Sequence, residues 1–199
     1  MHRTSTLLIA GLLVGCDGAT DAHDSGIDQI EYDVMSAAIS ALLAKEPFAR
    51  TPGVGEERRP IERVVIIAQP NHEVPATLGP LQADDGSAAD PSTLTDYARK
   101  SERPAFERRF GGIGPYELLP FDEMQTIFRA GTWTDFYRRF PESPGFFALS
   151  RVGVSGDQRE AVLFLLHIRG GTWGHESAML FRKQGESWIH AGTEMYSQF

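Results

Sequence analysis

The sequence is poor in cysteine and in positive charge, and both shortages exclude large classes of protein. Cys16 is the only cysteine among 199 residues, so the chain forms no internal disulfide and no thiolate cluster for zinc. Acidic residues outnumber basic ones, 27 to 19, and the formal net charge is −8. Such an acidic chain argues against binding to nucleic acid or to anionic lipid headgroups.

Long apolar runs are missing as well. A membrane-spanning helix needs roughly 20 apolar residues. The apolar stretches Val64–Ala68 and Ala161–Leu166 have the length of buried strands instead. Leu7–Val14 is also too short to span, and because it follows the basic residue Arg3, it has the form of the apolar part of an export signal.

The position of Cys16 directly after this apolar stretch and Gly15 resembles a bacterial lipoprotein signal peptide. In that class the cysteine is acylated, with chains such as palmitate, and becomes the first residue of the mature protein. We therefore expect a signal peptide at residues 1–15, a flexible polar tether at 16–28 and one globular domain at 29–199. The expected location is the bacterial cell envelope, at a membrane that the sequence does not specify. An ordinary secretory signal with a chance cysteine is the alternative.

Hydrophobic periodicity and turn residues predict an α+β domain, with an N-terminal helix, a short strand and middle helices preceding a β-sheet. Asp90 and Thr132 each have the form of an N-cap that opens a helix, and Phe121–Phe128 fits either a helix or a loop. The expected early elements are a helix over 28–45, a strand at Val64–Ile67, a helix from Asp90 that ends before Pro104, a short strand at Tyr116–Leu119 and a helix that Pro141 terminates.

The C-terminal third predicts about four strands in an antiparallel meander, because only short turns separate them. The aromatic stripe formed by Trp133, Phe136, Tyr137 and Phe140 is expected to cover the sheet from a helix. The four expected strands are Phe146–Val154, Ala161–Ile168, Ser177–Lys183 and Trp188–Met195.

The order of several short motifs resembles a family of small exported bacterial proteins with an LSRVGFN-like motif. These motifs are Phe140-Pro141, Ser143, Gly145, Leu149-Ser150-Arg151-Val152-Gly153, Ala161-Val162, Gly170-Gly171 with Gly174, and Trp188. The chain departs from that pattern at Val154-Ser155, where the family has Phe-Asn, and at Trp173, where it has cysteine. The resemblance implies a shared fold and brings no catalytic role with it.

The segment from Gly170 to Glu176 is the most suggestive local cluster. Its glycines, Gly171 among them, either bring backbone amides close to an anion or simply allow a turn with positive φ. Trp173, His175 and Glu176 are candidate ligand contacts, but their spacing matches no metal motif.

Arg151 is a further candidate contact, which we interpret as an ion-pair partner of a carboxylate in the fold, Glu160 or Glu176. A catalytic pairing of Ser150 with a histidine is not favoured, since no nucleophile elbow surrounds that serine.

The sequence thus predicts a tethered envelope protein that is a non-enzymatic binding or interaction module without a cofactor. Its partners would be the membrane, through the lipid at Cys16, and an unknown protein or small molecule. The alternative is a hydrolase or metal-dependent enzyme that uses His167, His175 and His190.

Overall fold

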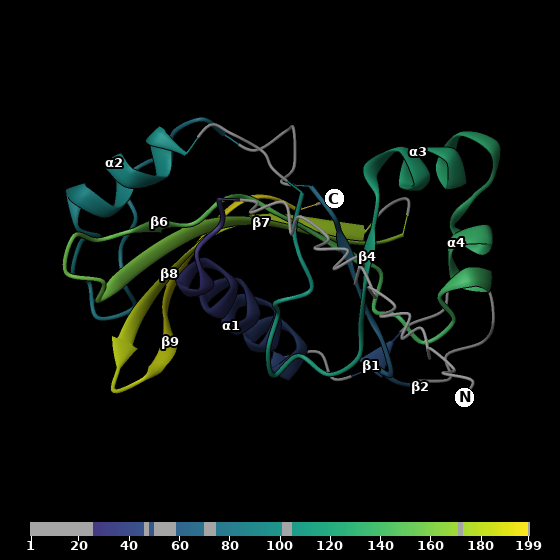
Figure 1. Cartoon of the computed structure of the whole chain (residues 1–199), viewed down its shortest axis with the longest axis horizontal. Helices are drawn as coiled ribbons and strands as arrows, with labels where there is room; N and C mark the ends of the chain where they lie inside the picture. The colour runs from purple at the N-terminus through teal and green to yellow at the C-terminus, as the bar shows by residue number, and fades with distance from the viewer. Residues whose placement is uncertain are drawn as a thin grey trace, which may run out of the picture.

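The protein has a mixed α and β fold, shown in Figure 1. The structure is a computed structural model that describes residues 26–45, 48–49, 59–69, 75–100, 105–170 and 173–198. Within these ranges it contains four helices and a seven-stranded sheet, as well as a small pair formed by β1 (Phe48–Ala49) and β2 (Arg59–Pro60). Most of the sheet is antiparallel and C-terminal, which is consistent with the predicted α+β class. The expected signal peptide, Cys16 and Gly171 lie outside the described residues.

The large sheet has the strand order β4-β3-β5-β7-β8-β9, and β6 pairs with β7 beside this path. Its strands are β3 (Val64–Ile67), β4 (Tyr116–Leu119), β5 (Phe146–Leu149), β6 (Gly153–Val154), β7 (Glu160–Gly170), β8 (Trp173–Gln184) and β9 (Ser187–Gln198). The neighbours β5, β7, β8 and β9 are antiparallel, as the meander prediction requires. The strand β3 itself was predicted, but its position was not: it pairs parallel with both β4 and β5 and so extends the sheet beyond the expected meander.

The expected continuous strand Phe146–Val154 is wrong, because the chain bends at Ser150–Val152 and separates β5 from β6. These three residues face only two residues of β7, as in a β-bulge. The Ser150 hydroxyl compensates for the interrupted ladder by accepting the backbone N–H of Phe164 at 2.8 Å. Ser150 is therefore a structural residue at a bend, buried to 3 % exposure.

Helices cover both faces of the sheet. On one face α1 (Gln29–Lys45) packs against alternate side chains such as Ile66, Leu163 and Leu165. On the other face α3 (Phe121–Ala130) and α4 (Trp133–Arg139) cover the β3–β5 end. The segment before α2 (Pro91–Arg99), together with Tyr97, covers the middle of β7 and β8 on that same face. Burial on both sides explains why β3, β5 and most of β7 are continuously apolar.

The helices confirm most of the local predictions. The Asp90 side chain accepts the Ser92 N–H at 2.7 Å and caps α2. Thr132 and Asp135 form the expected capping box, with the Thr132 N–H donating to the Asp135 carboxylate at 2.8 Å. The ambiguous segment from Phe121 is helical. None of the helices in the described ranges has the length and apolar character needed to cross a membrane.

The aromatic stripe of α4 packs largely as expected. Phe136 and Phe140 are fully buried, and Trp133 is half-buried beside them. At the other end of the chain, Ile27, which the sequence placed in the tether, is 1 % exposed within the α1 core. Packing of the chain therefore includes residues before α1.

Candidate ligand pocket

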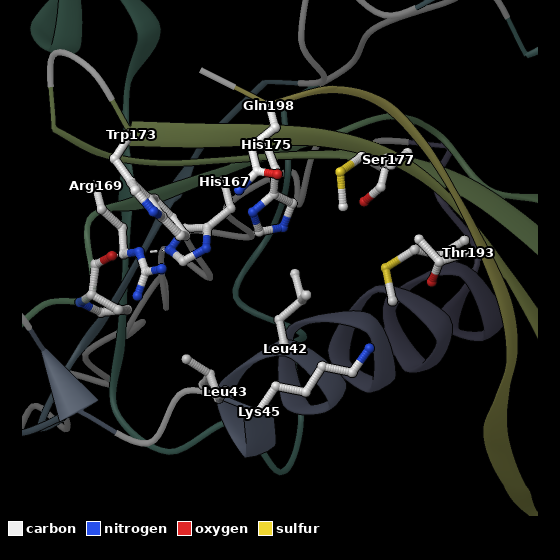
Figure 2. A pocket seen from close by; sticks show the side chains of 13 residues that line it. Leu42, Leu43, Lys45, His167, Arg169, Trp173, His175, Ser177, Thr193 and Gln198 are labelled. Carbon is white, nitrogen blue, oxygen red and sulfur yellow. Dashed lines mark hydrogen bonds between the residues drawn. The ribbon is translucent and has the colours of Figure 1, made fainter.

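A pocket of about 220 Å³ lies between the C-terminal end of α1 and the far end of the β7–β9 sheet (Figure 2). Leu42 and Leu43 of α1 form its apolar helix side. Met179 and Met195 extend this apolar surface along the sheet side. The pocket therefore has an apolar part near the helix and a polar part further along the strands.

Strand alternation produces the polar part. Side chains two residues apart on a strand share a face, so His167 and Arg169 of β7 follow Leu165 on the face that α1 covers. On β8 the residues Trp173, His175 and Ser177 line the same pocket. His175 lies directly across from His167, whereas a register shift between Ile168 and Gly170 pairs Trp173 with Gly170. Among the described residues of α1, which ends at Lys45, only Leu42, Leu43 and Lys45 line this end of the face.

Three aromatic rings form one corner of the pocket. The ring centroid of His167 lies 5.8 Å from that of Trp173 and 5.5 Å from that of His175, and both contacts are edge-on. His167 also stacks on Phe147 at 4.2 Å. Its Nε2 lies 2.9 Å from the carbonyl oxygen of Pro144, which can only accept, so Nε2 carries the proton. The corner is thus held in place by packing and one hydrogen bond.

The histidines of this corner are neutral at ordinary pH. Burial lowers the pKa of His167 to about 3, against the opposing effect of the Pro144 hydrogen bond. Burial also lowers the pKa of His175, and the positive charges of Arg169 and Lys45 add to that effect.

Two cations face the pocket, and no acidic side chain lies among the lining residues that the structure describes. The guanidinium carbon of Arg169 lies 3.1 Å from the centre of the Trp173 ring, so the cation and the indole are in cation–π contact. Burial lowers the pKa of Arg169 to about 10, which leaves it charged at neutral pH. The exposed Lys45 supplies the second charge from the helix side.

The structure brings together only part of the histidine group that the enzyme alternative requires. His167 and His175 are neighbours, whereas His190 bonds the Thr193 hydroxyl at 2.6 Å and is not a lining residue. Glu176 points to the opposite face from His175 and accepts a hydrogen bond from the Ser197 hydroxyl at 3.2 Å. Across the described ranges, no three His, Cys, Asp or Glu side chains are grouped as metal ligands.

Arg151 lies away from the pocket and stabilises a joint between α1 and the bend that follows β5. Its guanidinium donates to both carboxylate oxygens of Glu31, at 2.9 and 2.7 Å. Glu31 also accepts the Val152 N–H at 3.0 Å and pairs with Lys100 at 3.3 Å. The expected partners of Arg151, Glu160 and Glu176, are therefore wrong, because the true partner is 120 residues away in the sequence.

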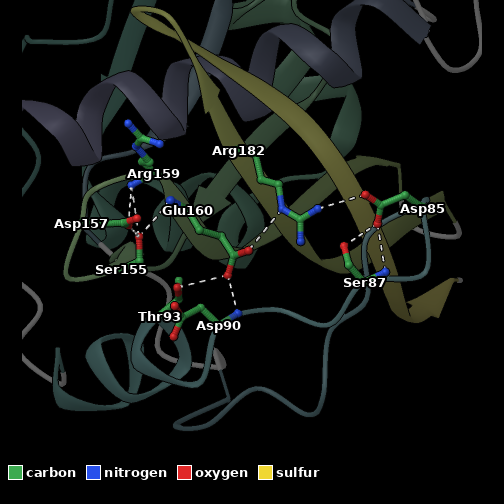
Figure 3. A network of polar contacts seen from close by, with 9 residues as sticks. All are labelled: Asp85, Ser87, Asp90, Thr93, Ser155, Asp157, Arg159, Glu160 and Arg182. Carbon is green, nitrogen blue, oxygen red and sulfur yellow. Dashed lines mark hydrogen bonds and ion pairs between the residues drawn. The ribbon is translucent and has the colours of Figure 1, made fainter.

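Glu160 instead fixes the N-terminus of α2 to the sheet (Figure 3). Its carboxylate accepts the Asp90 N–H at 2.6 Å and the Thr93 hydroxyl at 3.2 Å. Arg182 on β8 donates to it at 3.3 Å and also pairs with Asp85 at 3.2 Å. These contacts give the Glu160 carboxylate a structural role between α2 and the sheet.

The segment Leu149-Ser150-Arg151-Val152-Gly153 is explained by its packing. Leu149 and Val152 are buried in the core, and Ser150 and Arg151 stabilise the bend. Gly153 lies against α2, where a Cβ atom would be 2.7 Å from the Tyr97 backbone nitrogen. The motif is therefore a structural signature of this joint.

Of the residues proposed from the sequence, Trp173 and His175 line the pocket, while Arg151 and Glu176 do not. Sequence reasoning missed Lys45, Arg169 and Thr193. The alternation of His167 with Arg169 was a usable signal for one of them, but the approach of α1 and β9 was not visible in the sequence. No family model, curated protein or solved structure matches this chain.

Proposed function

We propose that this protein is an envelope lipoprotein, anchored through Cys16, whose folded domain binds a small ligand without catalysing a reaction. The observation that carries the proposal is the pocket beside α1, in which an apolar wall meets a few fixed polar groups. This combination is typical of small-molecule sites. The pocket also borders the end of the β7–β8 hairpin, where the sequence suggested ligand contacts.

The geometry around the histidines favours binding over catalysis. His167 uses Nε2 to hold the Pro144 carbonyl, so that nitrogen cannot act as a base while this bond persists. No hydrogen bond joins the lining residue Ser177 to either histidine among the described contacts, so the serine has no general base in place.

Binding can be tested by titrating the protein with small neutral and anionic solutes. The readout is the change in the NMR signals of the Trp173 indole and of the His167 and His175 rings. Thr193→Trp places a bulky ring on the exposed rim of the pocket. Glu194→Trp is the matched control, because the adjacent residue on β9 points to the opposite face. We expect at least one solute to bind the parent and the control but not Thr193→Trp. Equal binding to all three proteins, or to none, would reject the pocket as the site.

The enzyme alternative predicts a different metal content of the purified protein. Stoichiometric metal in the purified protein, lost in His175→Ala, would favour a metal-dependent enzyme over a binding protein. Under our proposal the protein carries no such metal.

The lipid anchor is tested separately by the mass of the mature N-terminus. We expect the mature chain to begin at Cys16 with acyl chains attached, and Cys16→Ser to abolish acyl labelling and processing. Two or more chains are needed for stable anchoring, since each buried methylene adds only about 0.8 kcal/mol. A free thiol at Cys16 in mature wild-type protein would reject the anchor.

A further inference from the structure

We propose that the ligand of this pocket is a small apolar molecule without positive charge, whose one hydroxyl group binds between His175 and Ser177. This inference rests on the proposed binding function and names the class of ligand. Three observations support it: two polar side chains of β8 that make no hydrogen bond, the lack of acids among the described lining residues, and the apolar walls with their volume.

The hydroxyl of Ser177 is the most informative polar group of the pocket. The residue is 2 % exposed, yet its side chain makes no hydrogen bond among the contacts of the described residues. In that part of the chain, every side-chain nitrogen or oxygen that is closed off from solvent has a hydrogen-bond partner. The Ser177 oxygen is therefore not closed off, and because the residue lines the pocket, it opens into that space. A ligand that fills the pocket removes water from this hydroxyl and has to replace the lost hydrogen bonds.

His175 lies two residues earlier on the same face of β8, about 7 Å along the strand. Its ring contacts His167 and Trp173 edge-on and makes no hydrogen bond among the described contacts. Burial lowers its pKa, so the ring is neutral and offers one N–H donor and one acceptor nitrogen. Figure 2 shows the side chains of His175 and Ser177 extending from the sheet toward α1. A ligand hydroxyl both donates and accepts, so one small group can bond to both residues.

The charges of the pocket exclude a cationic ligand. An ammonium group would lose its hydration here, and none of the described lining residues is an acid that could pair with it. After burial, nearby positive charges are the next cause of the lowered pKa of His175, and Lys45 is one of them. A further positive charge beside this ring is therefore disfavoured, and amines are poor ligands even where their carbon skeleton fits.

The apolar walls and the volume define the rest of the ligand. Leu42, Leu43 and Met179 offer no hydrogen bond, so an apolar body that covers them removes their surface from water. The thioether of Met179 also favours contact with an aromatic ring. The pocket volume is about 220 Å³, whereas a cavity of about 150 Å³ accommodates benzene. A single ring or a short chain with one hydroxyl fits, and a nucleotide or an acyl chain of membrane length does not.

The test is an NMR titration of the full chain with three probes of nearly equal shape. Benzyl alcohol carries the hydroxyl, ethylbenzene has a methyl group in its place, and benzylamine has an ammonium group at neutral pH. All titrations use one mild detergent at one concentration, so that loss of a probe to micelles is the same for every variant. We expect saturable binding of benzyl alcohol and none of benzylamine.

Ser177→Ala tests the hydroxyl partner directly. It should weaken benzyl alcohol by about three- to tenfold and leave ethylbenzene unchanged or bound more tightly. Because the Ser177 hydroxyl makes no hydrogen bond within the described protein, the midpoint of urea unfolding should not fall. Ser92→Ala on the exposed surface of α2 is the matched control and should change neither affinity. His175→Phe keeps a ring but removes both nitrogens, and should weaken benzyl alcohol by a similar factor.

Lys45→Glu tests the exclusion of cations. Lys45 is exposed at the rim, so reversal of its charge should give benzylamine measurable binding at low salt and leave benzyl alcohol unchanged. Lys183→Glu, near the other end of β8, is the matched reversal and should not allow benzylamine to bind.

The outcomes separate the two proposals. Binding of benzyl alcohol and ethylbenzene that Thr193→Trp blocks, but that Ser177→Ala and His175→Phe leave unchanged, would overturn the hydroxyl inference while the binding function stands. Binding of benzylamine to the parent as tight as that of benzyl alcohol would overturn it as well. Absence of binding by all three probes would overturn both.

Discussion

The ion-paired joint between α1 and the bend after β5 gives the sharpest prediction about stability. Glu31 has a side chain that is 1 % exposed, and its main partner, Arg151, is 10 % exposed. Replacing Glu31 by Ala removes both hydrogen bonds to the Arg151 guanidinium and leaves the buried Val152 N–H without its acceptor. Breaking one side of a buried ion pair costs about 3–5 kcal/mol, so we expect a loss of that size in the free energy of unfolding.

Urea unfolding followed by tryptophan fluorescence measures this loss, and urea is preferred because it does not screen charges. With a slope of about 2 kcal/mol per molar urea, the midpoint should fall by about 1.5–2.5 M. The exposed pair Arg63–Glu117, with 51 % and 30 % exposed side chains, is the matched control, and Glu117→Ala should cost less than about 1 kcal/mol.

A double-mutant cycle isolates the pair itself. Glu31→Met combined with Arg151→Met should cost at least about 1 kcal/mol less than the sum of the single changes, because residues in contact are coupled. A loss below about 1 kcal/mol for Glu31→Ala, or additive costs in the cycle, would refute the role that we assign to the joint.

The same joint predicts a pH dependence. Burial raises the pKa of Glu31, but the hydrogen bonds from Arg151 and Val152 and the charge of Lys100 outweigh it, so the pKa lies below its ordinary value. A lowered pKa means that the stabilisation is present above the unfolded value and is lost as pH falls through the folded value. The stability difference between wild type and Glu31→Gln should therefore be constant above about pH 5.5 and shrink in more acidic solution. A difference that grows as pH falls would contradict this sign.

Two further predictions concern packing. Phe136→Ala should cost about 3–5 kcal/mol in a urea melt, because Phe136 is fully buried between α4 and the sheet, whereas Thr134→Ala on the exposed side of α4 should change stability by less than about 0.5 kcal/mol. A loss well under 1 kcal/mol for Phe136→Ala would mean that the aromatic face of α4 is not packed against the sheet. Gly153→Ala should cost about 1–3 kcal/mol, because its Cβ would overlap the α2 backbone, while Gly156→Ala in the open β6–β7 turn should be neutral or slightly stabilising. Equal effects at the two glycines would show that α2 does not lie close to β6.

Local structure was predictable because it depends on residues close in the sequence. The caps at Asp90 and Thr132 need only a side chain and the N–H groups two or three positions later. The apolar runs of β3 and β7 likewise predict strands. The short turns after residue 154 predict that the strands they join are antiparallel. These features gave the α+β class and most of the element bounds.

The sequence by itself determined two neighbouring antiparallel strands around Ala161–Ile168 and Ser177–Lys183. Only the structure extended them, so that His167 and Arg169 share a face with Trp173 and His175 of the next strand. Only the tertiary structure decided that this face becomes a pocket, because α1 ends there and Lys45 approaches from outside the sheet. It also decided the pairing of Arg151 with Glu31, the parallel neighbours of β3 and the bend at Ser150. The physical reason is the same in each case: long-range contacts depend on the packing of whole elements, and that packing leaves no pattern among neighbouring residues.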